Sequence, residues 1–81
     1  MKIYQCKHVV EAMQWLDTDE KRLAFTVWFE GHDKMFVTRG PVALLPEEGE
    51  VTEGEWILWS DGEFIAMEDD LFVYDYKEVA G

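Results

Sequence analysis

The dipeptide Asp61-Gly62, with a short apolar run on each side, constrains the fold of this chain more than any other stretch. Both residues reach positive φ at low cost, which predicts a two-residue turn between antiparallel strands and sets Trp59 opposite Phe64. Side chains alternate along a strand. One face of the hairpin therefore carries Ile57, Trp59, Phe64 and Ala66, and the other carries Trp56, Leu58, Ile65 and Met67. Because both faces are apolar, we expect each to be covered and this hairpin, about residues 55–67, to be the centre of the sheet.

The length of 81 residues predicts one domain, residues 1–81, with a modest core. Aromatic residues make up 15% of the chain, so we expect either an unusually aromatic core or rings in a partner interface. No apolar run approaches the ~20 residues of a membrane span, and the start lacks the apolar region of a signal peptide. Cys6 is the single cysteine. A cytoplasmic location, where thiols stay reduced, fits these features best.

Helix and strand signals follow each other along the first half of the chain. Strands are predicted within residues 2–7 and 8–15, where β-branched and aromatic residues gather. Thr18 or Asp17 is a suitable N-cap, and the acids after it favour a helix from about 19 to 29. Leu23 to Phe29 also alternates as a strand would, and the sequence leaves both readings open.

The second half predicts short strands joined by turns. They are expected at 34–38, 42–45, 50–53 (a polar edge strand) and 73–79, with a turn at 47–49 and one helical turn at 68–72. The predicted fold is therefore α+β: a small, curved, mostly antiparallel sheet of five to seven short strands with one packed helix.

Charge is distributed unevenly. Residues 1–46 hold six acids and six bases, whereas residues 47–81 hold twelve acids and Lys77, so the net charge of −11 lies in the second part. This charge argues against nucleic acid and anionic membranes as direct partners and permits a basic protein. The alternative is an acidic surface that serves solubility only.

Two segments resemble a family of small uncharacterised bacteriophage and prophage proteins with a Pro-Gly-Asp-Tyr-Gly-like motif. The matching residues are Val9 to Trp15, Gly54 to Ile57, Gly62 to Phe64, Phe72 and Tyr76. In this chain Glu55 replaces the usual Asp, no proline precedes Gly54, and residues 21–46 do not align. The resemblance implies a phage origin, a small α+β fold and a bacterial host cytosol, and it carries over no catalytic residue.

Motifs for catalysis are missing from the sequence. His8, His32 and Cys6 lack zinc-type spacing, and the acidic runs lack the alternation of a calcium loop. Ser60 lacks the first glycine of a nucleophile elbow, and no glycine-rich loop precedes a helix. We therefore expect no enzyme, no metal and no cofactor.

The first functional hypothesis is a non-enzymatic protein that binds and inhibits a basic host protein, with acids that imitate a nucleic-acid backbone. One strand ladder is too sparse for this, so the edge strand and the turns at 61–63 and 68–70 would have to converge. The residues predicted to bind the partner are Glu47, Glu48, Glu50, Glu53, Glu55, Trp56, Trp59, Asp61, Glu63, Glu68, Asp69 and Asp70.

Two other functions stay open. One is an oligomeric sponge for a nucleotide immune signal, with bases to hold phosphates and an aromatic ring to stack the base. Its candidate residues are Lys7, Arg22, Trp28, Lys34 and Arg39. The other is a phage structural or assembly oligomer. The hairpin with two apolar faces favours self-association, and we expect a homodimer.

Overall fold

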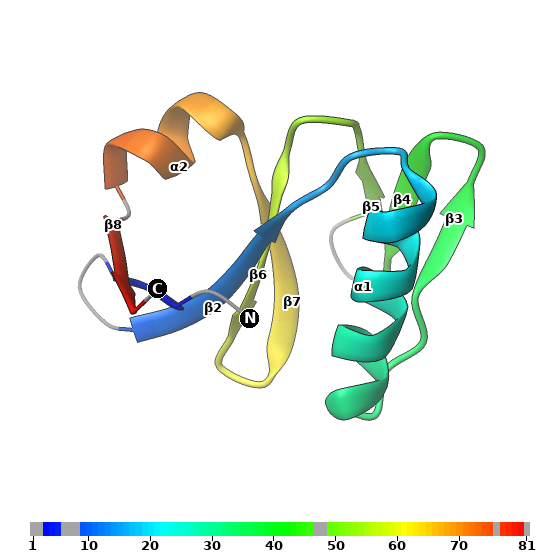
Figure 1. Ribbon diagram of the computed structural model, residues 1–81, viewed down its shortest axis with the longest axis horizontal. Coiled ribbons are helices and arrows are strands. Elements are labelled where there is room, and N and C mark those ends of the chain that lie inside the picture. The colour runs from blue at the N-terminus through cyan, green and yellow to red at the C-terminus, as the bar shows by residue number, and fades with distance from the viewer. Residues whose placement is uncertain (1–2, 6–8, 47–48, 76, 81) are drawn as a thin grey trace.

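The computed structural model describes residues 3–5, 9–46, 49–75 and 77–80, and Figure 1 shows their arrangement. The elements along the chain are β1 (Ile3–Gln5), β2 (Val9–Gln14), α1 (Asp19–Gly31), β3 (Val37–Arg39), β4 (Val42–Leu45), β5 (Gly49–Val51), β6 (Trp56–Ser60), β7 (Glu63–Met67), α2 (Asp69–Asp75) and β8 (Lys77–Ala80). The predicted α+β class is confirmed.

The β6–β7 hairpin forms around the predicted turn. Asp61 and Gly62 have φ values of 52° and 82°, which are the left-handed values of a type I′ turn. Trp59 pairs with Phe64 and the same register continues to Trp56 and Met67. The predicted register is therefore confirmed.

The hairpin lies at one edge of its sheet, so the prediction that it forms the centre is wrong. The strand order is β7-β6-β2-β1-β8, with β2 in the middle. Glu11 to Gln14 of β2 pair with Trp59 to Trp56 of β6. β2 suits the central place because it packs against both cores: Val10 and Ala12 belong to one core cluster, and Met13 packs against the other.

A second sheet holds β3, β4 and β5, so the prediction of one curved sheet is also wrong. Gly40 has positive φ and allows the tight turn between β3 and β4, and β4 pairs antiparallel with both β3 and β5. β3 starts at Val37 rather than at residue 34, and β5 covers Gly49–Val51 rather than 50–53. β5 lies at a sheet edge, as the polar sequence predicted.

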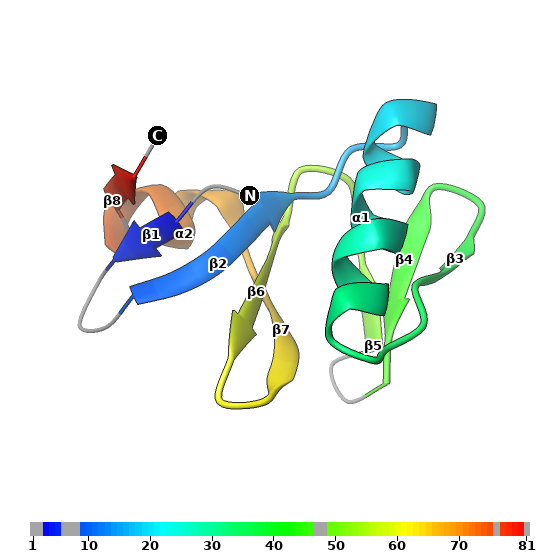
Figure 2. The same ribbon diagram turned by 60° about the horizontal axis from the view of Figure 1, so that its bottom comes forward.

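Both faces of the hairpin are covered, as the alternation predicted. The larger core contains Trp15, Phe25, Trp28, Phe29, Ala43, Leu45, Val51, Ile57 and Phe64. On the other face Leu58 packs with Val10, Ala12 and Phe72. Figure 2 shows the hairpin between α1 with the second sheet on one side and α2 on the other. The five-stranded sheet therefore separates two cores.

Residues 23–29 are helical, which resolves the open alternative and confirms the predicted helix. Thr18 is the N-cap, and its Oγ1 accepts a hydrogen bond of 3.1 Å from the Lys21 N–H. Phe25, Trp28 and Phe29 are buried. Their spacing of three and four places them on one face of a helix, which a strand could not do.

A second helix, α2, follows the hairpin, although only one packed helix was predicted. The Glu68 carbonyl accepts a hydrogen bond of 2.9 Å from the Phe72 N–H, and the helix then continues to Asp75. Val73 and Tyr74, predicted as strand, are therefore helical. Phe72 is 2% exposed and stacks on Trp56 with ring centroids 3.9 Å apart. This tertiary contact favours the helix over the alternating pattern.

Candidate acidic binding surface

Three segments that are distant in the sequence meet at one edge of the molecule. The strands β2, β6 and β7 are antiparallel, so β2 and β7 end where β6 begins. Gln14 Nε2 donates to the Gly54 carbonyl at 2.9 Å and contacts Asp69 Oδ1 at 3.4 Å. The Asp17 N–H donates to a Glu53 carboxylate oxygen at 3.1 Å. These bonds hold the starts of α1, β6 and α2 side by side.

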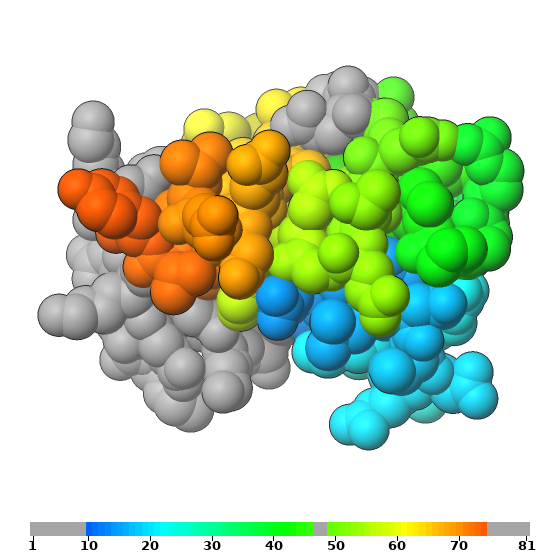
Figure 3. Space-filling model, turned by 90° about the horizontal axis from the view of Figure 1, so that it is seen from above, coloured from blue at the N-terminus to red at the C-terminus, as the bar shows by residue number. Residues whose placement is uncertain are grey.

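The carboxylates at this edge form the candidate surface, which we call the acidic edge. Figure 3 looks down on it and shows the segments before and at the start of α1, the loop before β6 and α2 next to one another. α1 and α2 each carry two acids in the first turn. The acidic edge consists of Asp17, Asp19, Glu20, Glu53, Glu55, Glu68, Asp69 and Asp70.

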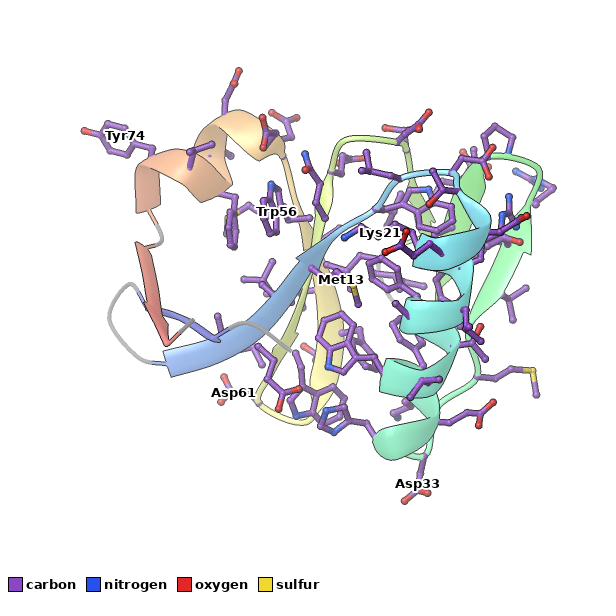
Figure 4. All side chains as sticks on the ribbon, in the orientation of Figure 1. Met13, Lys21, Asp33, Trp56, Asp61 and Tyr74 are labelled. Carbon is purple, nitrogen blue, oxygen red and sulfur yellow. The ribbon has the colours of Figure 1, made fainter. Side chains whose placement is uncertain are left out.

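Asp69 is held in a fixed orientation. The Trp56 indole N–H donates to Asp69 Oδ1 at 2.8 Å, while the Trp56 ring stacks on Phe72. In Figure 4 the labelled Trp56 lies beneath α2, whereas Tyr74 points away from the molecule. Trp56 therefore orients a carboxylate of the acidic edge and fills the smaller core at the same time.

The loop before β6 is shaped by one of its own acids. A Glu55 carboxylate oxygen accepts from the Thr52 N–H at 2.7 Å and from the Thr52 hydroxyl at 2.8 Å. The backbone bonds from Gly54 N–H to Trp15 carbonyl and from Trp15 N–H to Glu55 carbonyl, both 2.8 Å, join the loop to the end of β2. The loop is thereby fixed in place, and Glu53 stays exposed at its tip.

Basic neighbours compensate little of this charge. Arg22 pairs with Asp17 and also donates to the Thr38 hydroxyl and the Gly40 carbonyl. Among the described residues no other acid of the edge has an ion pair, since the remaining pairs join Arg39 to Glu50 and His32 to Glu11. A surface rich in carboxylates with few basic neighbours attracts basic groups.

The converging segments overcome the sparseness of a single strand ladder. Eight carboxylates from the segment at the start of α1, the loop before β6 and the start of α2 lie at one edge. Along one strand, side chains on the same face are ~6.5–7 Å apart, so the edge presents more carboxylates than any one strand could.

Other residues predicted to bind the partner lie elsewhere. The Asp61 turn is at the opposite end of the hairpin (Figure 4), so the turns at 61–63 and 68–70 do not converge. Glu50 is paired with Arg39, and Trp59 stacks on His32 with ring centroids 3.9 Å apart. Glu47 and Glu48 lie outside the described residues. Of the predicted set, Glu53, Glu55, Trp56, Glu68, Asp69 and Asp70 meet at the acidic edge.

The sequence reasoning missed three acids of the edge and an apolar surface beside it. Asp17, Asp19 and Glu20 were assigned to helix capping alone, although a run of acids before a helix is also a charged surface. On α2, Leu71, Val73 and Tyr74 are exposed by 54%, 65% and 89%. The sequence held a partial signal, because four successive apolar or aromatic residues, 71–74, cannot all face the same side of a helix.

The residues of the predicted nucleotide site do not come together. Arg22 and Arg39 are engaged with Asp17 and Glu50, and Trp28 is buried with its N–H bonded to Glu11 at 2.7 Å. Lys34 lies beyond the C-terminal end of α1, at a separate pocket. Lys7 lies outside the described residues.

Glu11 connects β2 to α1 and has a shifted pKa. Its carboxylate accepts from the Trp28 indole N–H and lies 3.0 Å from His32 Nε2. The hydrogen bond from Trp28, followed by the hydrogen bond and charge of His32, lowers the pKa of Glu11 despite partial burial. This cluster holds the helix on the sheet.

Within the described ranges, no three His, Cys, Asp or Glu side chains are grouped to hold a metal ion. None of the described helices is long and apolar enough to cross a membrane. No family model, curated protein or solved structure matches this chain.

Proposed function

We propose that this chain is a non-enzymatic accessory protein of the phage type that binds a basic host protein through the acidic edge and inhibits it. The observation that carries the proposal is the convergence of eight carboxylates from three segments on one edge, where only Asp17 has a basic partner among the described residues. A host protein that handles nucleic acid carries the complementary surface, a basic groove for phosphates.

The apolar residues of α2 support a protein partner over a bound small cation. Leu71 and Tyr74 are exposed directly beside Asp69 and Asp70. Protein interfaces combine an apolar or aromatic centre with a polar rim, and tyrosine is enriched among the residues that dominate binding energy. A partner of this kind buries these side chains while its lysines and arginines meet the acids. Since the same basic groove binds nucleic acid, its occupation blocks that activity.

The test is affinity capture from a bacterial lysate at low salt, with a charge variant and a matched control. The variant Glu53→Gln, Glu68→Gln, Asp70→Asn removes three charges from the acidic edge and keeps the hydrogen-bond acceptors. The control Glu30→Gln, Asp33→Asn, Asp61→Asn removes three charges elsewhere, and Figure 4 shows Asp33 and Asp61 at the other end of the molecule. Both Asn substitutions suit the positive φ of these positions.

We expect the wild type and the control to retain one basic partner that the edge variant loses. With the purified partner, affinity should fall about tenfold or more when salt is raised from low to several times physiological strength, because screening shortens the range of the charges. The partner should also lose nucleic-acid binding in proportion to its occupancy. Equal capture by the two variants, or an affinity independent of salt, would refute the proposal.

A further inference from the structure

The strand β7 leaves one backbone edge unpaired. In a two-residue hairpin the residues flanking the turn exchange both backbone hydrogen bonds, and such pairs then alternate along the strands. Glu63 and Ile65 therefore bond to β6, whereas the N–H and C=O groups of Phe64 and Ala66 point away from it. β7 ends the sheet, and among the described residues these outward groups have no hydrogen-bond partner.

An apolar pocket opens beside this edge. Its volume is about 240 Å³, and its lining consists of Phe29, Lys34, Met35, Val37, Pro46, Glu63 and Phe64. The rings of Phe29 and Phe64 stack with centroids 3.7 Å apart. Met35 and Val37 are exposed by 78% and 43%. The pocket thus has an aromatic floor and an exposed apolar rim.

The position of the pocket relates it to the free backbone groups. Glu63 and Phe64 are successive residues, so their side chains leave opposite faces of the strand, yet both line the pocket. A pocket that touches both must lie beside the strand rather than over one face. The other lining residues come from α1, from the segment that follows it and from the second sheet, namely Phe29, Lys34, Met35, Val37 and Pro46.

We propose that β7 accepts an extended segment of a partner protein as an added strand, with one large apolar side chain of that segment in the pocket. Strand addition takes its affinity from backbone hydrogen bonds and its specificity from pockets for alternate side chains. The volume of about 240 Å³ is below the range of ~300–1,000 Å³ for drug-sized ligands and suits a single side chain.

The charges beside the pocket select the partner segment. A neighbouring hollow shares Lys34 and Met35 with the pocket and adds Glu30 and Asp33, while Glu63 lies on the other rim. Glu30 and Asp33 outnumber Lys34 in this hollow, which favours a segment with basic residues beside its apolar anchor. A second copy of this chain, with a net charge of −11, is disfavoured at the same place. This inference does not rest on the acidic edge.

The direct test is amide hydrogen exchange of the full chain, followed residue by residue by NMR. The probe is an acetylated and amidated peptide, Lys-Val-Phe-Val-Lys, with companions that carry Leu, Trp or Met at the centre. In the free protein the amides of Phe64 and Ala66 should exchange rapidly while that of Ile65 is protected. Saturation with the best peptide should slow exchange at Phe64 and Ala66 at least tenfold and leave Ile65 unchanged.

Backbone methylation of the peptide separates strand addition from simple occupation of the pocket. In an extended peptide alternate N–H groups face opposite edges. Methylation of the second and fourth residues, or of the third and fifth, therefore removes donors from one edge only. The two methylated peptides should differ in Kd about tenfold or more, because only one set removes bonds to β7. A peptide with Glu in place of both Lys should also bind at least tenfold more weakly.

Two protein variants complete the test. Met35→Ser should weaken peptide binding several-fold, whereas Leu23→Ser, an equally exposed apolar position on α1 with 67% exposure, should not. The inference is overturned if no peptide of the set binds at millimolar concentration, or if Phe64 and Ala66 are already protected in the free protein. Equal affinities of the two methylated peptides, or protection of both amides by protein concentration alone in step with dimer formation, would also overturn it.

Discussion

Leu58→Ala tests whether the sheet separates two independent cores. Leu58 is fully buried, and its cluster contains three other buried residues, Val10, Ala12 and Phe72. Truncation of a buried leucine costs about 2–5 kcal/mol, depending on how far the cavity closes. The cover over this site is a short helix of seven residues, and we expect it to shift toward a smaller side chain. We therefore expect the lower part of the range, about 2–3 kcal/mol.

This loss is large for a chain of 81 residues, whose total stability lies at about 4–12 kcal/mol. Urea unfolding at 25 °C measures it directly, with the slope against urea compared between variants. In a thermal scan the same change lowers Tm by roughly 8–24 °C. The control is Leu71→Ala on α2, where the side chain is 54% exposed and the expected cost is under ~0.5 kcal/mol.

Double variants distinguish the two faces. Phe25 and Leu58 lie on different elements and belong to different clusters, so Phe25→Leu and Leu58→Ala should add within about 0.5 kcal/mol. Phe72→Leu shares the cluster of Leu58 and should couple with it by more than that. A cost of Leu58→Ala below about 1 kcal/mol, or a stronger coupling across the sheet than within the cluster, would refute the two-core arrangement.

Two further predictions concern the turn and a carboxylate. Asp61→Pro with Gly62→Val should lower Tm strongly, because neither new residue adopts the observed positive φ; an unchanged Tm would contradict the turn, and Asp61→Asn is the tolerated control. The Trp28 hydrogen bond, and after it His32, lowers the pKa of Glu11, so the ionised carboxylate stabilises the fold. This contribution is complete above the ordinary pKa of 4.5 and is lost as pH falls through the lower pKa of the folded state. Glu11→Gln should therefore be less stable than wild type at pH 7 in urea unfolding, and the difference should shrink as pH falls below 4.5, whereas a constant difference would exclude this linkage.

Local patterns predicted the elements whose determinants are close in the sequence. The Asp61-Gly62 turn set the hairpin register down to Trp56 and Met67, and Thr18 marked the start of α1. The patterns failed where a distant contact decides. Val73 and Tyr74 alternate as a strand would, but burial of Phe72 against Trp56 makes the segment helical. Likewise, nothing near the hairpin indicates that β2 rather than β6 is central.

The sequence predicted that the candidate surface is acidic, but not which residues form it. The charge count assigned the acidic character to residues after 46, and Glu53, Glu68, Asp69 and Asp70 do form part of one edge. Asp17, Asp19 and Glu20 join them because the antiparallel pairing of β2 with β6 brings the start of α1 to the loop before β6. Counting charges along the sequence does not show which strands pair, so the acids of this one surface were assigned to two separate halves of the chain.

The sequence by itself determined the turn, the two apolar faces of the hairpin and the start of the helix at Thr18. These follow from backbone preferences and from periodicity, both of which act over a few residues. Only the tertiary structure decided which strands are neighbours, that two sheets form instead of one, and which carboxylates share an edge. Strand pairing depends on contacts across dozens of residues, such as Glu11 with Trp59, and their free energy is shared by the whole core rather than encoded in any one segment.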